Sequence, residues 1–367
     1  MLCAASGGAA LEDWFQREVA PALRRTGAGT AIVETSLAVA KGRADVDPKF
    51  QLRRLFAREG VTTQFIFDSE PGETDYSANA SLVEAVRQSG TLPAPMLRVS
   101  ALPPETTVLS IYMDRIQTKG SAAYLPVITR MTIEAGSPEI FWSDSLDDGP
   151  RWTDYHAGIA RVHASGKLLT ADEVKRLVAQ ALLAPTASAT PLIVCLHSGL
   201  RTLYSGLRDS GGDDLPSVTN DGAWVVRIRA DEDTAQMSGD QVKHPSAPGY
   251  IGLRVGLYQP RGRVGLYYFV SPSNQYGRVI SQRSRTRFDV TDRGLRDPWQ
   301  QLGVTEIAIM RDGNFGCRTD IAHQTALLCR NAPMWEGNLR LPAPMHMAKQ
   351  VAQDHPLIEV NRRMHAG

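Results

Sequence analysis

The chain has 367 residues, 43% of them hydrophobic, and a formal net charge of +1 at pH 7. This length and hydrophobic content are enough for a sizeable core and predict two domains. The near-zero net charge excludes a bulk polycation, so any contact with nucleic acid must come from local basic patches.

Helix and strand patterns alternate over the first third of the chain. Residues 47–60 carry helix signals at both ends, because Asp47 and Pro48 suit the start and Gly60 suits the end. The alternation predicts a small parallel α/β domain over 1–105. The expected elements are a helix over 11–25, a strand over 30–39, a helix over 47–60, a strand over 61–67 and a helix over 78–90.

A proline-rich stretch over 92–106 predicts a connection between two domains. The remainder, 106–367, predicts a mixed sheet of about five strands flanked by helices. The helix over 170–184 begins with Thr170 and Glu173 in capping-box spacing. The other expected elements are strands at 107–116, 192–196, 223–230, 250–259, 264–271 and 305–311, a hairpin over 124–144, a helix that opens with Arg201 after the turn at 197–199, and helices over 319–332 and 341–356.

Basic residues gather on the helix over 47–60, and polar residues near it complete a candidate phosphate site. A helix N-terminus with convergent cations and an amide can bind phosphate. A solvated basic helix explains the same pattern, and the spacing does not decide between the two. The residues concerned are Lys49, Arg53, Arg54, Arg58, Gln64 and Arg87.

A second arginine-rich segment lies at 278–290. Arg283, Arg285 and Arg287 alternate, so on a strand they would share one face and suit a nucleic-acid backbone. An exposed strand edge whose charges discourage aggregation is the other explanation. Arginine outnumbers lysine by 33 to 7 in the chain. A GC-rich genome accounts for this bias, and so does phosphate or guanine recognition.

The stretch VVRIRADED combines two arginines with three acids. Arg227 and Arg229 are expected on one face of a strand, and Asp231, Glu232 and Asp233 follow directly. Such an acidic trio can bind a divalent cation, but it is also common in an ordinary charged turn.

Absent motifs exclude several classes of site. The eight histidines form neither HxH nor HExxH, and no P-loop occurs, so neither a zinc site nor ATP use is supported. The four cysteines form no CxxC pair and are expected to be reduced thiols. The N-terminus lacks a basic signal region, and no run reaches the roughly 20 apolar residues that span a bilayer. We therefore expect a soluble cytoplasmic protein without a membrane partner.

Several segments, taken in order, resemble the Argonaute/PIWI superfamily. DPKFQLRRLFAREGVTTQFI (47–66) and VRQSG (86–90) resemble parts of a MID domain, and LPAPMHMAKQVA (341–352) resembles the last helix of PIWI domains. YLPVITRMTIEAG, the pair Trp152 and Tyr155, GLRTLYSGL and VVRIRADED are similar to the prokaryotic pPIWI-RE group, which is named for an arginine and a glutamate. The order of these motifs is more specific than any one of them.

The resemblance implies a MID domain over 1–105 that seats the 5′ end of a guide strand. It also implies an RNase H-like PIWI domain over 106–367 that holds the guide–target duplex. By position, the residues that match the phosphate pocket are Lys49, Arg53, Gln64 and Arg87. The candidates for the group's arginine and glutamate are Arg201, Arg227, Arg229 and Glu232.

The chain departs from cleaving members at the catalytic acids. The strand VITRMTI, expected to be the first of the PIWI sheet, offers Arg-Met-Thr at 130–132 where an aspartate is expected, and the turn at 197–199 reads His-Ser-Gly instead of Arg-Asp-Gly. Two-metal hydrolysis needs carboxylates that hold two cations about 4 Å apart. The weak candidates for catalysis or for a Mg²⁺ ligand are Glu134, Glu232 and His346.

The leading hypothesis is a nuclease-inactive MID–PIWI module that binds guide and target strands in prokaryotic defence against mobile elements. The resemblance adds an operon-encoded helicase and a restriction-type nuclease as partners. A nuclease that uses Mg²⁺ with Glu134 and Glu232 is the alternative, and a structural protein without nucleic-acid binding is a third.

Overall fold

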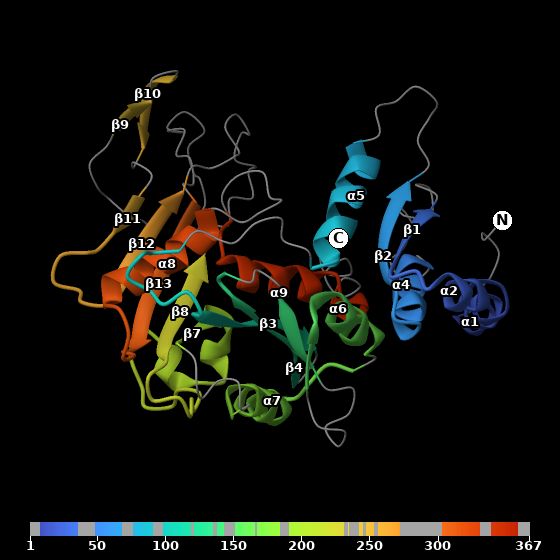
Figure 1. Cartoon of the computed structure of the whole chain (residues 1–367), viewed down its shortest axis with the longest axis horizontal. Coiled ribbons are helices and arrows are strands. Elements are labelled where there is room, and N and C mark those ends of the chain that lie inside the picture. Colours follow the sequence, from blue (N-terminus) through green and yellow to red (C-terminus); the bar gives the residue numbers. More distant parts are fainter. Residues whose placement is uncertain are drawn as a thin grey trace.

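The structure is a computed structural model, and the residues that it describes are 8–35, 48–67, 76–90, 98–118, 121–134, 138–142, 151–165, 167–183, 191–230, 234, 242–244, 247–252, 256–271, 303–330 and 339–358. Two bodies of secondary structure lie side by side, a small N-terminal unit and a larger unit built around a long sheet (Figure 1). Each contains a hydrophobic core of its own.

The N-terminal unit consists of a two-stranded parallel sheet and helices. Its core is formed by apolar residues of the first helices and of the helix before β2, with Phe15 and Phe56 in edge-to-face contact at 5.0 Å. The parallel register places Ile32 beside Gln64. The elements are α1 (Gly8–Trp14), the π-helical turn η1 (Phe15–Val19), α2 (Ala20–Thr26), β1 (Thr30–Thr35), α4 (Pro48–Arg58), β2 (Thr62–Phe67) and α5 (Tyr76–Gln88).

The passage from α4 to β2 follows the expected helix signals. Pro48 is the first helical residue, where its missing N–H costs no hydrogen bond. Gly60 has a φ of 77°, which a residue with a Cβ rarely adopts, and its N–H donates to the carbonyl of Ala57. The helix ends there, and β2 begins two residues later.

The larger unit contains a nine-stranded sheet in the order β11-β12-β13-β8-β7-β3-β4-β5-β6. Strands β3, β7 and β8 run parallel at its centre, and the other pairs are antiparallel. The strands are β3 (Thr107–Thr118), β4 (Ser121–Thr132), β5 (Glu139–Trp142), β6 (Arg151–Asp154), β7 (Leu192–His197), β8 (Trp224–Ala230), β11 (Gly256–Tyr258), β12 (Leu266–Ser271) and β13 (Gly303–Arg311). A separate hairpin joins β9 (Val242–His244) to β10 (Ala247–Gly252).

Helices cover this sheet and connect it to the N-terminal unit. α9 packs on β3 and β4, and α6 packs on α4 of the N-terminal unit, so that both lie at the junction (Figure 1). The Thr170 and Glu173 side chains each accept from the other's backbone N–H, which confirms the expected capping box. The elements are α6 (Tyr155–Ala164), α7 (Ala171–Leu183), the 3₁₀ turns η3 (Ser198–Thr202) and η4 (Ser205–Leu207), α8 (Arg318–Arg330) and α9 (Ala343–Gln353).

The predicted fold class, α/β with a mixed sheet, is confirmed, and three details of the prediction are wrong. The sheet has nine strands instead of about five. β5, β6 and β11 have only three or four residues, too few for a periodic pattern. The strand VITRMTI is not the first of the sheet, because β3 precedes it and pairs with β7. The helix expected to open near Arg201 is a 3₁₀ turn that begins at Ser198.

Among the residues that the structure describes, no helix is long and apolar enough to cross a membrane. The three cysteines in the same ranges, Cys195, Cys317 and Cys329, are free thiols.

Candidate functional site

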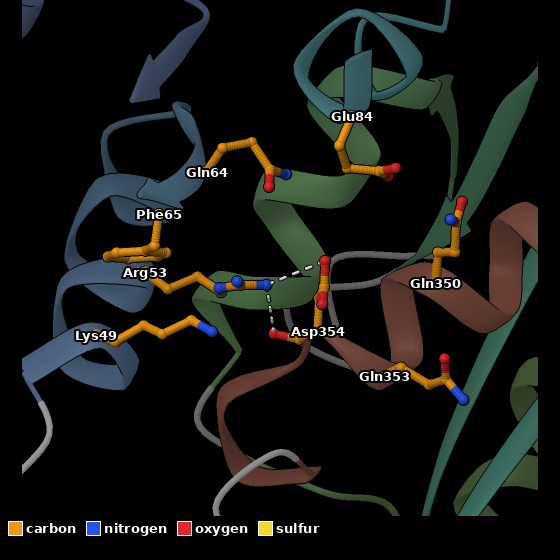
Figure 2. A pocket seen from close by; sticks show the side chains of 8 residues that line it. All are labelled: Lys49, Arg53, Gln64, Phe65, Glu84, Gln350, Gln353 and Asp354. Carbon is orange, nitrogen blue, oxygen red and sulfur yellow. Dashed lines mark hydrogen bonds and ion pairs between the residues drawn. The ribbon is translucent and has the colours of Figure 1, made fainter. Parts of the chain in front are cut away.

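A pocket of about 320 Å³ lies at the junction between the two units. Residues from α4, β2 and α5 form one side, and residues at the end of α9 form the other (Figure 2). It is lined by Lys49, Arg53, Gln64, Phe65, Glu84, Gln350, Gln353 and Asp354. Three of the four residues that the resemblance assigned to the phosphate pocket, Lys49, Arg53 and Gln64, therefore lie together.

Arg53 is the buried cation of this pocket. Its side chain is 5% exposed, and its Nη1 donates to the Asp354 carbonyl at 3.0 Å and lies 3.1 Å from Asp354 Oδ2. The guanidinium also lies over the Phe65 ring, 5.5 Å from the centroid, and Lys49 Nζ lies 5.6 Å from the same centroid. The two cations are therefore held on one aromatic surface, with their charged ends directed toward α9 (Figure 2).

Gln64 places an unsatisfied buried donor in the pocket. The residue is 8% exposed, and its Nε2 has no hydrogen-bond partner among the residues that the structure describes. Figure 2 shows this amide on β2 at the pocket, between Arg53 and Glu84. A buried donor without a partner costs free energy, so Gln64 is poised to donate to a bound acceptor.

Two carboxylates that the sequence analysis did not assign to the pocket, Glu84 and Asp354, balance the charges of Lys49 and Arg53. Burial raises the pKa of Glu84, and the nearby Arg87 opposes this shift. Arg87 Nη1 lies 3.0 Å from Glu84 Oε2, so Arg87 acts on the pocket through Glu84 and does not line it. The pocket thus offers many donors without an excess of positive charge.

The turn after β7 is where the resemblance led us to expect an aspartate. His197 lies beside Tyr112 of β3, with ring centroids 4.5 Å apart, and Ser198 is buried. A Cβ added at Gly199 would lie 3.0 Å from His197 Nδ1, so the turn is tightly packed. β3, β7 and the turn together supply one carboxylate, that of Asp114. Mg²⁺ prefers oxygen ligands and usually takes carboxylates, so this set does not fit a pair of Mg²⁺ ions.

The other catalytic candidates do not join this turn. Glu134 is exposed beyond the end of β4. Burial lowers the pKa of His346 to about 3, with Lys349 and Arg87 adding to the shift, so its imidazole is neutral. Within the described ranges, no group of three or more His, Cys, Asp and Glu side chains is arranged to hold a metal ion. Glu232 lies outside these ranges.

Arg227 and Arg229 lie on one face of β8, as their alternation predicts, but they are buried. Arg227 Nη2 lies 2.7 Å from Glu306 Oε1 on β13, and its Nη1 donates to the Leu207 carbonyl at 2.8 Å. Arg229 Nη2 donates to both oxygens of Asp209, at 2.8 and 3.0 Å. These contacts form a buried ionic cluster at the end of β8.

The acids of this cluster are Glu306 and Asp209, which the sequence analysis did not single out. Tyr268 Oη donates to Glu306 Oε2 at 3.3 Å. Burial raises the pKa of Asp209, but Arg229 and Arg227 outweigh burial and hold that pKa below its usual value. A signal for Glu306 exists in the sequence, because it is the only charged residue within the apolar run of TEIAIM at 305–310.

Among the described residues, one further arginine candidate, Arg201, lies at neither site. Arg201 lies half-exposed on η3, and its carbonyl accepts from Arg208 Nε at 3.3 Å. Arg283, Arg285 and Arg287 lie outside the described residues, so their predicted alternation on a strand face stays a prediction.

Comparison with known protein families accounts for both units. Residues 5–96 match the model of the MID domain of pPIWI_RE, and residues 108–357 match the model of the RNaseH domain of pPIWI_RE. No curated protein matches the chain.

Several solved structures are similar to this chain at low sequence identity. The Argonaute of Clostridium butyricum bound to a guide DNA and a 19-mer target DNA gives a TM-score of 0.48 at 10% identity, over 95% of this chain and 40% of that chain. Drosophila Piwi gives 0.46 at 8% identity, over 95% of this chain and 41% of that chain. The C-terminal lobe of a budding yeast Argonaute gives 0.45 at 9% identity, over 90% of this chain and 63% of that chain. The chain thus spans about 40% of the length of the C. butyricum protein.

Proposed function

The chain belongs to the pPIWI_RE family, with its MID and RNase H-like domains, and from this membership we propose that it binds nucleic acid through the pocket at the junction of its two units. We place the boundary between a MID-like domain, 1–105, and a PIWI domain, 106–367. The two matched ranges, 5–96 and 108–357, support this division. The ligand proposed is the 5′ end of a guide strand, which pairs with a target strand.

The observation that carries this proposal is the unpartnered amide of Gln64 beside Arg53. A buried donor and a buried guanidinium directed into one pocket match the oxygens of a terminal phosphate. Lys49 adds a third donor group from the same helix that carries Arg53. Further contacts to the nucleic-acid backbone are proposed for Arg201, Arg227, Arg229, Arg283, Arg285 and Arg287.

We also propose that the chain does not cleave the strand that it binds. The support is the packing at the strand-end turn, where the His197 ring stacks on Tyr112 in the place of a carboxylate pair. An imidazole against a phenol ring cannot hold two cations in the spacing that hydrolysis of a phosphodiester needs. The proposed role is recognition in prokaryotic defence, in the cytoplasm, with cleavage left to operon-encoded partners, a helicase and a restriction-type nuclease.

The test compares one oligonucleotide with a 5′ phosphate and with a 5′ hydroxyl. We expect the phosphorylated form to bind more tightly by about tenfold, the gain of one charge-assisted hydrogen bond. The preference should be lost in the Arg53→Gln variant, whereas Arg58→Gln, on the same helix but paired with Glu12 outside the pocket, should retain it. Equal affinities of the two oligonucleotides for the unmodified chain would contradict the proposal.

A further inference from the structure

In the cluster of Arg227, Arg229, Glu306 and Asp209, both positive charges are buried but only one of the two negative charges is. The two arginine side chains are 6% and 8% exposed, and that of Glu306 is 4% exposed, whereas that of Asp209 is 67% exposed. Two buried positive groups therefore face one buried negative group, and the second balancing charge lies at the surface.

This imbalance cannot be relieved by a change of protonation. A guanidinium keeps its proton at every pH that a protein meets, and a buried charge without a counter-charge is costly. The cluster therefore requires an anion at the position of Asp209. Water screens an exposed ion pair, so the aspartate holds this position only weakly against another anion.

The geometry at Asp209 also suits a phosphate. Its Oδ1 lies 2.9 Å from Arg227 Nη2 and 2.8 Å from Arg229 Nη2, so one oxygen bridges two guanidinium groups. Arginine forks bind phosphate oxygens in the same manner. Asp209 belongs to an exposed loop, residues 208–214, that follows η4, so its side chain can leave without disturbing the core.

We propose that Arg227 and Arg229 form a second anion site, separate from the pocket at Arg53, which binds one phosphate of a nucleic-acid backbone when Asp209 swings outward. Asp209 occupies this site in the ligand-free chain as an internal substitute for the phosphate. The inference rests on the proposed function for the source of the phosphate, but not for the anion site itself.

The first experiment uses inorganic phosphate and thermal unfolding. The Asp209→Asn variant should unfold at a lower temperature than the unmodified chain in chloride and should recover when phosphate replaces chloride at constant ionic strength. Asp213→Asn removes the same charge from the same loop and should respond to phosphate as the unmodified chain does. The double variant Asp209→Asn with Arg229→Gln restores the buried charge balance, so it should lose the phosphate response. An equal response of Asp209→Asn and Asp213→Asn would overturn the proposal.

The second experiment measures the affinity for a 5′-hydroxyl oligonucleotide as a function of salt. Asp209→Asn should bind about tenfold more tightly, and its log–log salt dependence should steepen by about 0.7, the value for one more phosphate contact on a single strand. A phosphate response without oligonucleotide binding would leave the anion site standing and contradict the proposed function. Oligonucleotide binding that is identical in all variants, without a phosphate response, would overturn the anion site and leave the proposed function intact.

Discussion

At the scale of single residues, the buried amide of Gln64 is expected to lower the stability of the fold and to strengthen the binding of a ligand. Leucine at this position has a similar volume and no unpaired donor, so Gln64→Leu should raise the free energy of unfolding by about 1 kcal/mol while weakening the binding of a 5′-phosphorylated oligonucleotide. Urea unfolding and a titration measure the two effects. Gln88→Leu is the matched control, because Gln88 also has a buried unpartnered atom, its Oε1, but lies outside this pocket. A Gln64→Leu variant that binds the oligonucleotide as tightly as the unmodified chain would show that Gln64 does not contact the ligand.

The residues of the pocket also show what the sequence could and could not predict. Lys49, Arg53 and Gln64 lie close together in the chain, so helix and strand spacing was enough to group them. Asp354 pairs with Arg53 across 301 positions, and no local pattern reports such a contact. Arg227 and Arg229 show the same limit: their shared strand face followed from alternation, but their burial against Glu306 depends on strand β13.

At the scale of elements, the packing of α6 against the end of α9 buries two histidines. Burial lowers the pKa of His163 to about 3, with Arg53 adding to the shift, and burial likewise lowers that of His355 to about 3, with His163 adding to the shift. In the unfolded chain each of these histidines binds a proton below about pH 6.5, whereas in the folded chain it stays neutral. The free energy of unfolding should therefore decrease as the pH is lowered below this value, by up to about 1.4 kcal/mol per pH unit for each histidine. Urea unfolding between about pH 7 and pH 5 tests this.

Two variants separate these histidines from other causes of acid sensitivity. His163→Gln retains a donor for the Val351 carbonyl, which lies 3.0 Å from His163 Nε2, but does not titrate. It should therefore reduce the loss of stability between these pH values by about a third, since His355 and the similarly shifted His346 remain. His323→Gln changes an exposed histidine on α8 and should leave the pH dependence as it is. An unchanged dependence in His163→Gln would show that the α6–α9 contact is not the cause.

Elements with a strong local signal appear where they were predicted, whereas elements without such a signal were missed. The α7 helix, with its capping box, and the apolar strand β7 are both determined by local residues, and both appear where expected. β6 and α6 were not predicted, although Trp152 and Tyr155 were noted there. β6 has four residues and pairs only at the edge of the sheet, so its conformation depends on β5 beside it.

At the scale of the whole molecule, the pairing of Arg53 with Asp354 connects the N-terminal unit to α9. Asp354→Asn leaves the backbone contact but removes the charge opposite a buried guanidinium, so we expect a loss of about 1–2 kcal/mol in the free energy of unfolding. The loss should shrink when a 5′-phosphorylated oligonucleotide supplies the missing anion, as denaturant unfolding with and without the oligonucleotide would show. Glu12→Ala breaks the exposed pair with Arg58 and should cost about 0.3 kcal/mol or less. Equal effects of the two variants would mean that the junction does not depend on this charge.

The two sides of the pocket are also far apart in the order of synthesis. Lys49, Arg53 and Gln64 leave the ribosome about 300 residues before Gln350 and Asp354, which face them. A nascent chain therefore carries only half of the pocket. The proposed binding of a nucleic-acid end needs both sides of the pocket, so it should require that α9 has been synthesised and has folded against the N-terminal unit.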